Sequence, residues 1–182
     1  MQSVSYNVET AGESGSEPCL TADDLQKFLT ANNIPSKIEQ MPHEAASVEE
    51  SAQALGICAD RLVKSIVLWI SEEYPIMVVA AGTRRINLSA VAKLLSVSRK
   101  KCRMCKPEEA LLATGYRIGT IPPIGHRTVL RTLVDKSVMS AVEESAEDGL
   151  VYCGGGDLIS QLVISPSELL KAANGEVVDI LS

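Results

Sequence analysis

The segment from Thr114 to His126 contains the residue types best suited to chemistry. It holds three glycines and the pair Pro122–Pro123 around a short apolar stretch. Glycine lets the backbone approach a bound group closely, and proline fixes φ and removes an N–H donor. We expect Tyr116 to Ile121 to form a short strand that the prolines end at a sheet edge. Such a rigid backbone suits ligand binding, although a tight connection without function has the same spacing.

Lys64 is the only charged residue in the apolar run from Leu62 to Ile70. The run is aliphatic at nearly every position, as expected for a strand covered on both faces. By the two-residue period of a strand, Lys64 shares a face with Ile66 and Leu68, so an ammonium lies on an aliphatic surface. Either the stem follows that surface and carries the charge to water, or the cation faces a pocket and binds an anion.

Two further features suit a binding site but have structural alternatives. Gly154, Gly155 and Gly156 join two predicted strands, and three successive glycines exceed what a hairpin turn needs. A close approach to a ligand is one interpretation, and a simple turn is the other. His126 could act as a base, but a histidine that follows a glycine is about as often structural.

The cysteines indicate a reducing compartment and no metal. They are five in number, an odd count, and are scattered along the chain: Cys19, Cys58, Cys102, Cys105 and Cys153. Cys102 and Cys105 are the only close pair. With only two histidines in the sequence, that pair cannot by itself complete a tetrahedral zinc site. We predict no metal and no cofactor; a redox pair stays open beside the simpler interpretation of thiols without function.

Charge is distributed unevenly along the chain, whose net charge is −6. The stretch from Arg84 to Lys106 holds eight basic residues and no acidic one, while the other nine basic and all 23 acidic residues give the remainder a net charge of −14. A local positive field on an acidic body can hold a phosphate backbone without general affinity for nucleic acid. The alternative is a solvated basic surface.

Length and composition favour one folded domain. A chain of 182 residues with 46% hydrophobic composition can bury a single sizeable core, which we place at residues 19–182. Residues 1–18 are polar and should form a disordered tail without a secretory signal. No apolar run approaches the roughly 20 residues of a membrane span. We therefore expect a soluble cytoplasmic protein that binds no membrane.

The predicted elements alternate between helices and strands. Capping residues, prolines at first helical positions and terminal glycines predict helices at 21–32, 47–55, 86–95, 107–113 and 165–174. Apolar runs predict strands at 36–41, 61–70, 75–82, 116–121, 128–134, 150–153, 157–164 and 176–181. We interpret 141–149 as an acidic loop.

Taken in order, these features resemble the YbaK/prolyl-tRNA synthetase-associated editing domain family, over about residues 21–181. The residues that carry the resemblance are Glu49-Glu50-Ser51-Ala52, Lys64, Thr114-Gly-Tyr-x-x-Gly119-x-x-x-Pro123-x-Gly125-His126, Asp135, Gly154 to Gly156 and Ile164-Ser-Pro-x-Glu-Leu169. The resemblance implies an α+β fold with a mixed, mostly antiparallel, barrel-like sheet flanked by helices.

It also implies a function, which is hydrolysis of the ester that joins a wrong amino acid to tRNA, typically alanine or cysteine on tRNA for proline. The implied partners are mischarged aminoacyl-tRNA and prolyl-tRNA synthetase, with no DNA. The implied catalytic residues are Lys64, Gly119 and Pro123. We add as substrate-binding residues Thr120, Gly125, His126, Asp135, Gly154, Gly155 and Gly156, and as tRNA-binding residues Arg84, Arg85, Arg99, Lys100, Lys101 and Arg103. Thr120 and Pro122 replace the Gly and Ser often found in the motif, which leaves the preferred amino acid open.

The residue chemistry agrees with such a reaction. An aminoacyl ester is already activated, so its hydrolysis needs a tight pocket, a donor for the developing oxyanion and a positioned water. We find no Ser-His-Asp or Cys-His set and expect no covalent acyl-enzyme. A noncatalytic module that binds tRNA or a synthetase is the alternative. The enzymatic hypothesis requires that Lys64 and the segment from Gly119 to Pro123 meet across one cavity.

Overall fold

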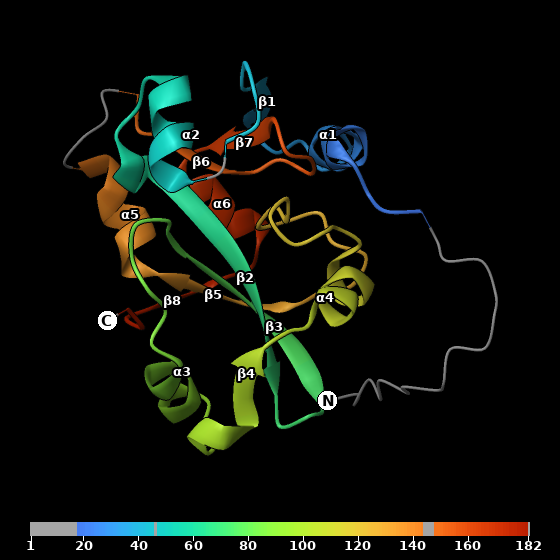
Figure 1. The fold of residues 1–182 in the computed structure, drawn as a ribbon, viewed down its shortest axis with the longest axis vertical. Helices are drawn as coiled ribbons and strands as arrows, with labels where there is room; N and C mark the ends of the chain where they lie inside the picture. Colours follow the sequence, from blue (N-terminus) through green and yellow to red (C-terminus); the bar gives the residue numbers. More distant parts are fainter. Residues whose placement is uncertain (1–17, 46, 144–147, 182) are drawn as a thin grey trace.

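The computed structural model describes residues 18–45, 47–143 and 148–181, which form one mixed sheet with helices around it (Figure 1). The predicted tail, apart from Pro18, lies outside the described residues. The strands are β1 (Ser36–Gln40), β2 (Leu62–Ile70), β3 (Tyr74–Ala81), β4 (Cys102–Met104), β5 (Arg131–Asp135), β6 (Val151–Gly154), β7 (Ser160–Ile164) and β8 (Glu176–Val178).

The sheet has the strand order β1-β7-β6-β2-β3-β5-β8, with β4 paired to β2. The pairs β1–β7, β6–β7, β2–β3 and β2–β4 are antiparallel, and β2–β6, β3–β5 and β5–β8 are parallel. The predicted α+β class with a mixed sheet is therefore confirmed. Over the described strands the sheet is open, because its path begins at β1 and ends at β8 without pairing them.

The helices begin and end at residues whose side chains or backbone conformations cap them. They are α1 (Ala22–Ala31), α2 (Val48–Leu55), α3 (Leu88–Leu94), α4 (Pro107–Thr114), α5 (Lys136–Glu143) and α6 (Pro166–Ala172), with short 3-10 turns η1 (Ala59–Arg61) and η2 (Arg99–Lys101). In α2 the hydroxyl of Ser47 accepts a hydrogen bond from the N–H of Glu50, and Gly56 ends the helix in the left-handed conformation. The predicted cap and stop are confirmed. None of the described helices is long and apolar enough to cross a membrane.

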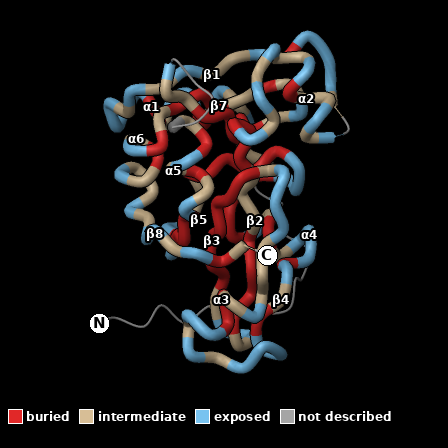
Figure 2. The backbone as a smooth tube through the Cα atoms, turned by 90° about the vertical axis from the view of Figure 1, so that its left-hand side faces the viewer, coloured by how far each residue is buried: buried red, intermediate tan, exposed pale blue. Residues whose placement is uncertain are grey.

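β2 and β3 form the buried centre of the molecule (Figure 2). Their side chains alternate between two apolar clusters on opposite faces of the sheet. Val63, Val67 and Trp69 belong to one cluster, whereas Leu68 and Ile70 belong to the other. The prediction of a strand covered on both faces is therefore correct, and the aliphatic composition of the run is its cause.

The sheet has a gap along one edge of β2. On the side away from β3, β6 pairs only with Leu62 and Val63, and β4 pairs only from Leu68 to Ile70. Between these two strands, the edge of β2 from Lys64 to Ile66 has no strand partner among the described residues. The gap lies in the middle of an otherwise paired strand and leaves room for a cavity.

Three predictions about local structure are wrong, and one short strand was not predicted. Residues Tyr116 to Ile121 form a turn and not a strand, because the N–H of Thr120 bonds to the carbonyl of Arg117 at 3.1 Å and Gly119 has φ +93°. The predicted acidic loop begins inside α5, whose Val138 and Ala141 are buried. Strand β4 was not predicted because three residues are too few for a clear period. The strand predicted at 128–134 begins only at Arg131.

Candidate active site

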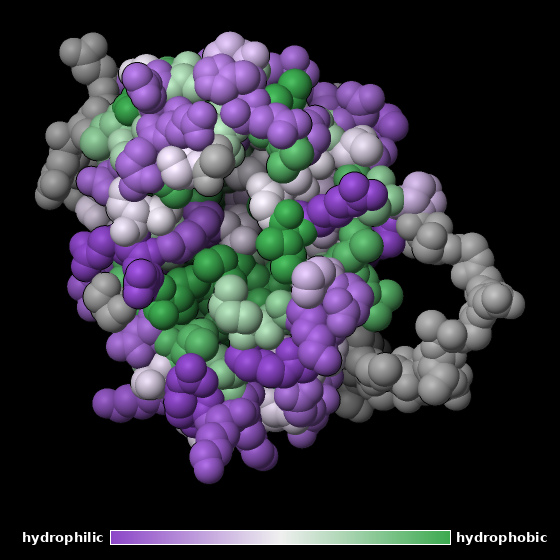
Figure 3. Space-filling model, in the orientation of Figure 1, coloured by the Kyte–Doolittle hydropathy of each residue, from purple (hydrophilic) through white to green (hydrophobic). Residues whose placement is uncertain are grey.

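A cavity of about 410 Å³ lies at the gap in the sheet, between α2, β2 and the turn at Gly119. It is lined by Ala45, Ser47, Val48, Ser51, Leu62, Val63, Lys64, Ser65, Gly82, Gly119, Ile121, Gly154 and Gln161. Lys64 and Gly119, which lie far apart in the sequence, therefore face the same small space. On the face drawn in Figure 3, apolar residues gather at the middle of the molecule, between α3 and α4.

Lys64 is held at the cavity by backbone carbonyls. Its ammonium donates hydrogen bonds to the carbonyl of Gly82, at 3.1 Å, and to the carbonyl of Arg84. Burial lowers the pKa of Lys64, and the positive charge of Arg85 lowers it further. None of the described carboxylates forms an ion pair with this ammonium. A partly buried cation that, among the described residues, is compensated only by neutral carbonyls gains from an anion placed beside it.

The turn at Gly119 depends on glycine for its backbone conformation. Its φ of +93° lies in the region that residues with a Cβ rarely adopt. A Cβ built there would meet nothing within 4 Å, so space is not the constraint. The turn is fixed to the next glycine segment by a hydrogen bond of 3.0 Å from the N–H of Gly156 to the carbonyl of Thr120.

The three successive glycines allow close approaches between parts of the protein backbone. A Cβ on Gly154 would lie 2.6 Å from the carbonyl oxygen of Ile121, and a Cβ on Gly155 would lie 2.5 Å from the carbonyl oxygen of Ser160. A Cβ on Gly156 would lie 2.7 Å from the N atom of Ala22. The glycines thus bring the turn at Gly119 against β6, and only Gly154 of the three lines the cavity.

Four predicted site residues have structural positions outside the cavity lining. The Nε2 of His126 lies 2.7 Å from the carbonyl of Pro122, so this nitrogen carries the proton. Burial lowers the pKa of His126, which this hydrogen bond opposes. The Asp135 carboxylate is fully buried and accepts hydrogen bonds of 2.8 Å from the N–H groups of Ser137 and Ile180. Pro123 is buried and Gly125 packs against α1.

Thr120 faces a second cavity, of about 750 Å³, on the other side of the same turn. Its hydroxyl donates to the carbonyl of Arg117 at 3.0 Å. Ile118 and Gly156 line that second cavity too, whereas Gly119, Ile121 and Gly154 line the first. The turn and the glycine segment are therefore a wall between two cavities, and the predicted residues divide between them.

The sequence comparison identifies the family. The family model described as aminoacyl-tRNA editing domain matches residues 42–172. The chain belongs to this family. The match includes the whole lining of the cavity, from Ala45 to Gln161. The predicted resemblance is therefore confirmed.

Relatives of this editing domain include free-standing proteins and parts of synthetases. "Putative Cys-tRNA(Pro)/Cys-tRNA(Cys) deacylase EbsC" of Enterococcus faecalis is 26% identical over 159 residues, which is 86% of this chain and 92% of the relative. A proline–tRNA ligase of Thermosipho melanesiensis is 33% identical over 92 residues, which is 50% of this chain and 16% of the ligase. The solved structure "Crystal structure of a putative trans-editing enzyme for prolyl tRNA synthetase" has a TM-score of 0.78 and 26% identity, and covers 88% of this chain and 96% of its own.

The basic run of the editing domain forms two separate surfaces. Arg84 and Arg85 follow β3 next to Lys64, whose ammonium bonds to the carbonyl of Arg84. Residues Arg99–Lys101 form η2, and the next residue, Cys102, pairs with Ile70 at the far end of β2. Six residues of strand separate Lys64 from Ile70, or about 20 Å. The basic run therefore does not form a single surface. One group of basic residues lies beside the cavity and the other lies distant from it.

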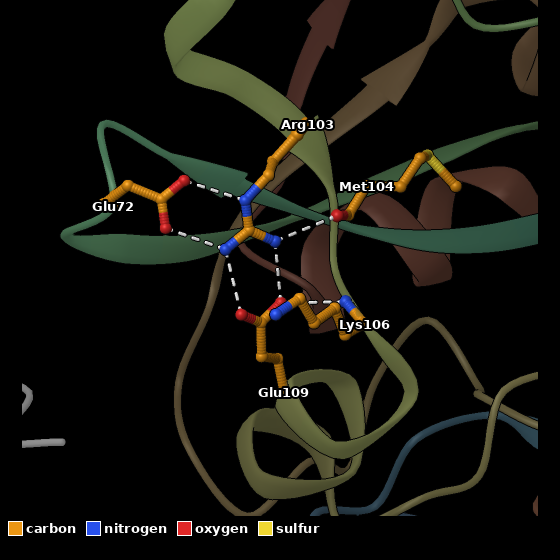
Figure 4. Close-up of polar contacts among 5 residues, drawn as sticks. All are labelled: Glu72, Arg103, Met104, Lys106 and Glu109. Carbon is orange, nitrogen blue, oxygen red and sulfur yellow. Dashed lines mark hydrogen bonds and ion pairs between the residues drawn. The ribbon is translucent and has the colours of Figure 1, made fainter. Parts of the chain in front are cut away.

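Arg103 belongs to neither group, because two carboxylates bind its guanidinium (Figure 4). Its Nε and one terminal nitrogen contact Glu72 at 2.8 Å each, and its two terminal nitrogens contact Glu109 at 2.7 and 2.9 Å. Hydrogen bonds from Arg103 lower the pKa of Glu109 to about 2 and also lower the pKa of Glu72. The guanidinium lies 5.8 Å from the centre of the Trp69 ring. These contacts occupy the donors that a phosphate would need.

Cys102 and Cys105 lie on opposite faces of the sheet. Cys102 belongs to the apolar cluster with Leu68, whereas Cys105 belongs to the cluster with Val67. Burial raises the pKa of both thiols, that of Cys105 to about 12. A disulfide between them would require this part of the sheet to unfold. Across residues 18–45, 47–143 and 148–181, no group of three or more His, Cys, Asp and Glu could hold a metal ion.

Sequence reasoning missed several residues of the cavity, of which Ser65 and Gln161 are polar and central. Ser65 is adjacent to Lys64 and is the other polar residue in the apolar run of β2, which was a usable signal. Gln161 pairs with Gly154 across the β6–β7 ladder. No local pattern around Gln161 predicts that register, so its place at the cavity needed the structure.

Proposed function

We propose that this editing domain is a free-standing deacylase that hydrolyses the ester of mischarged tRNA, with cysteine or alanine on tRNA for proline as substrates. The observation that carries the proposal is the shared cavity of Lys64 and Gly119, in a chain of the aminoacyl-tRNA editing family. With about 410 Å³ the cavity is at the small end of ligand sites and suits a small aminoacyl group.

Lys64 supplies the positive charge of the site in this proposal. Its ammonium exchanges the carbonyl of Arg84 or Gly82 for the terminal phosphate of the tRNA, or for the charge that develops on the ester. The N–H of Thr120 already bonds to the carbonyl of Arg117, so the N–H of Gly119 is the donor that faces the ester carbonyl and stabilises the oxyanion. Because the ester is already activated, the fixed position of these donors and of an attacking water is sufficient for catalysis.

No side-chain nucleophile is needed for this reaction. The serines of the lining have no histidine beside them, since neither His43 nor His126 lines the cavity. A hydroxyl of the terminal ribose, or the thiol of a cysteinyl substrate, assists from the substrate side. The reaction therefore proceeds without an acyl-enzyme.

The proposed partners are mischarged tRNA and prolyl-tRNA synthetase, in the cytoplasm. The similarity to parts of proline–tRNA ligases and to the solved structure of a "putative trans-editing enzyme for prolyl tRNA synthetase" supports both partners. Arg84 and Arg85 are beside the cavity, where the 3′ end of the tRNA would lie. Arg99, Lys100 and Lys101 are about 20 Å along β2, within reach of the neighbouring duplex.

Deacylation assays with purified protein test the proposal. One tRNA for proline is charged in turn with cysteine, alanine, serine and proline, and the release of each amino acid is measured over the uncatalysed rate. We expect release of cysteine or alanine and retention of proline. Retention of all four, together with salt-sensitive binding of uncharged tRNA, would replace the enzymatic proposal with a noncatalytic tRNA-binding module.

A further inference from the structure

Ser65 carries a hydroxyl that has no hydrogen-bond partner within residues 18–45, 47–143 and 148–181. Its Oγ is buried and has no hydrogen bond to any described residue. Buried polar atoms without partners are few in native proteins, and each requires an explanation. Because Ser65 also lines the cavity of Lys64 and Gly119, a bound ligand offers that explanation.

The gap in the sheet explains why none of the described groups reaches this hydroxyl. Ser65 is at the middle of the unpaired edge of β2, between the end of pairing with β6 and the start of pairing with β4. It shares the strand face of Val63 and Val67, which are apolar. The neighbouring cavity walls from Ile121 and Gly154 provide no polar side chain either.

The other serines of the cavity differ from Ser65 in this respect. The hydroxyl of Ser51 donates to the carbonyl of Ser47 at 3.0 Å. The hydroxyl of Ser47 accepts from the N–H of Glu50 at 3.1 Å. Both therefore complete the first turn of α2. Among the described serines that line the cavity, Ser65 alone has its hydroxyl unsatisfied.

A serine side chain needs one bond rotation to change the direction of its hydroxyl. The three staggered positions about Cα–Cβ point the oxygen in different directions, and the residue itself is only part-buried at the cavity. Rotation about this bond changes the direction of the oxygen, and an oxygen that faces the cavity can both donate and accept a hydrogen bond.

We infer that Ser65 makes the site select small aminoacyl side chains that carry a hydroxyl or a thiol. This inference rests on the proposed deacylase function and narrows its substrates, because it favours cysteinyl and seryl esters over the alanyl ester, whose side chain has no hydrogen-bonding group. A site that holds a hydrogen-bonding group for its substrate discriminates against an analogue that lacks one, because the buried group is then left unpaired. A purely apolar pocket would separate these side chains by size alone.

The test compares side chains of equal size that differ in hydrogen bonding. One tRNA is charged with cysteine, with serine or with 2-aminobutyrate, in which a methyl group replaces the thiol or hydroxyl. We expect the wild-type protein to deacylate the cysteinyl or seryl ester about tenfold or more faster, in kcat/KM, than the aminobutyryl ester. Ser65→Ala should bring that ratio to about twofold or less, and Ser65→Thr should keep it.

Ser51→Ala is the matched control, because it removes a cavity serine whose hydroxyl already has a protein partner. It should leave the ratio of the two rates unchanged. The thermal unfolding midpoint of Ser65→Ala should equal or exceed that of the wild type, since its hydroxyl contributes no bond to the folded state. A clear fall in that midpoint would show a structural partner and overturn the inference.

The outcomes separate this inference from the function on which it rests. If the wild-type protein deacylates none of the esters, the proposed function fails. If it deacylates cysteinyl and aminobutyryl esters at equal rates, or if Ser65→Ala slows both by the same factor, the deacylase stands and the role of Ser65 in selection is refuted. A ratio that falls only in Ser65→Ala supports the inference.

Discussion

The two ends of β2 differ in how far their polar groups are satisfied. At the Ile70 end, β4 completes the sheet, and Arg103 is bound by Glu72 and Glu109. At the Lys64 end, as far as the structure describes the chain, the sheet has a gap, the ammonium bonds only to carbonyls and a buried hydroxyl has no partner. One strand thus carries a closed, fully paired region and an open, partly unpaired region.

From this difference we expect one end to contribute mainly to stability and the other to contribute mainly to the proposed substrate binding. A satisfied network gives free energy to the folded state and has nothing left for a ligand. Polar groups without hydrogen-bond partners lower the stability of the folded protein, and that stability is regained when a ligand supplies the partners. Substitutions at the two ends should therefore affect different measurements, and each prediction below can break that separation.

The largest expected effect is on catalysis, from Lys64→Met. Methionine keeps the apolar stem of lysine and removes the charge, so packing along β2 is retained. We expect kcat/KM for an aminoacyl-tRNA that the wild-type protein deacylates to fall about 100-fold, as for loss of a group that stabilises developing charge. The free energy of unfolding in urea should change by less than about 1 kcal/mol. A large loss of stability with normal kcat/KM would reverse the roles of the two ends.

Arg103→Met is the counterpart at the Ile70 end. It removes two bidentate contacts and the stacking on Trp69, and leaves Glu72 and Glu109 facing each other. Because Glu72 is largely exposed and solvent screens its contact, we expect a moderate fall in the free energy of unfolding in urea, smaller than for a buried ion pair. The kcat/KM of the folded variant should match the wild type. A fall in tRNA binding at full stability would restore Arg103 as a phosphate ligand.

The sequence predicted the fold well because its signals were local. Ser47 with Glu50, Gly56 and the apolar run of β2 each set their own element. The turn at Gly119 was mistaken for a strand because its apolar residues suited one, while the deciding factor was a left-handed glycine. The helix α5 was missed because its buried residues are few and acidic residues follow it.

The site was predictable in part. Lys64 and Gly119, which both line the cavity, were singled out because a charge in an apolar strand is conspicuous and because glycines near the Pro122–Pro123 pair are. Their catalytic roles stay predictions. His126 and Asp135 bear equally reactive groups, but only the structure shows that Pro122 and the N–H groups of Ser137 and Ile180 already bind them. The division of the basic run depends on where β4 pairs with β2, which no local pattern encodes.

A smaller effect should follow from reversing charge in the two basic groups. The double variant Lys100→Glu, Lys101→Glu should bind full-length tRNA about tenfold more weakly at low salt. The slope of the logarithm of the binding constant against the logarithm of the salt concentration should fall by the amount that about two phosphate contacts contribute. The same double variant should bind a terminal aminoacyl trinucleotide normally, because η2 is about 20 Å from Lys64.

Arg84→Glu should weaken the binding of both the tRNA and the trinucleotide, since Arg84 adjoins the cavity. Lys27→Glu on α1 is the control for net charge, because Lys27 is exposed and outside the basic run. Equal losses from both groups on the trinucleotide would mean that the basic run acts as one surface after all.

The smallest expected effect is on acid stability, and it separates the two carboxylates of the Ile70 end. Glu109 has a folded pKa of about 2, below its ordinary 4.5, because Arg103 and the N–H of Lys106 bind its charged form. The stability it contributes is present above about pH 4.5 and is lost as the pH falls toward 2. Glu109→Gln should therefore reduce the free energy of unfolding at pH 6 and flatten its decline between pH 4.5 and 3.

Glu72→Gln should change both the free energy of unfolding at pH 6 and its decline less than Glu109→Gln does. Glu72 is 69% exposed and Glu109 is 22% exposed, so solvent screens the contact of Glu72 with Arg103 more strongly. Urea unfolding at several pH values measures both variants, and an equal response would show that Arg103 is held by the two carboxylates alike.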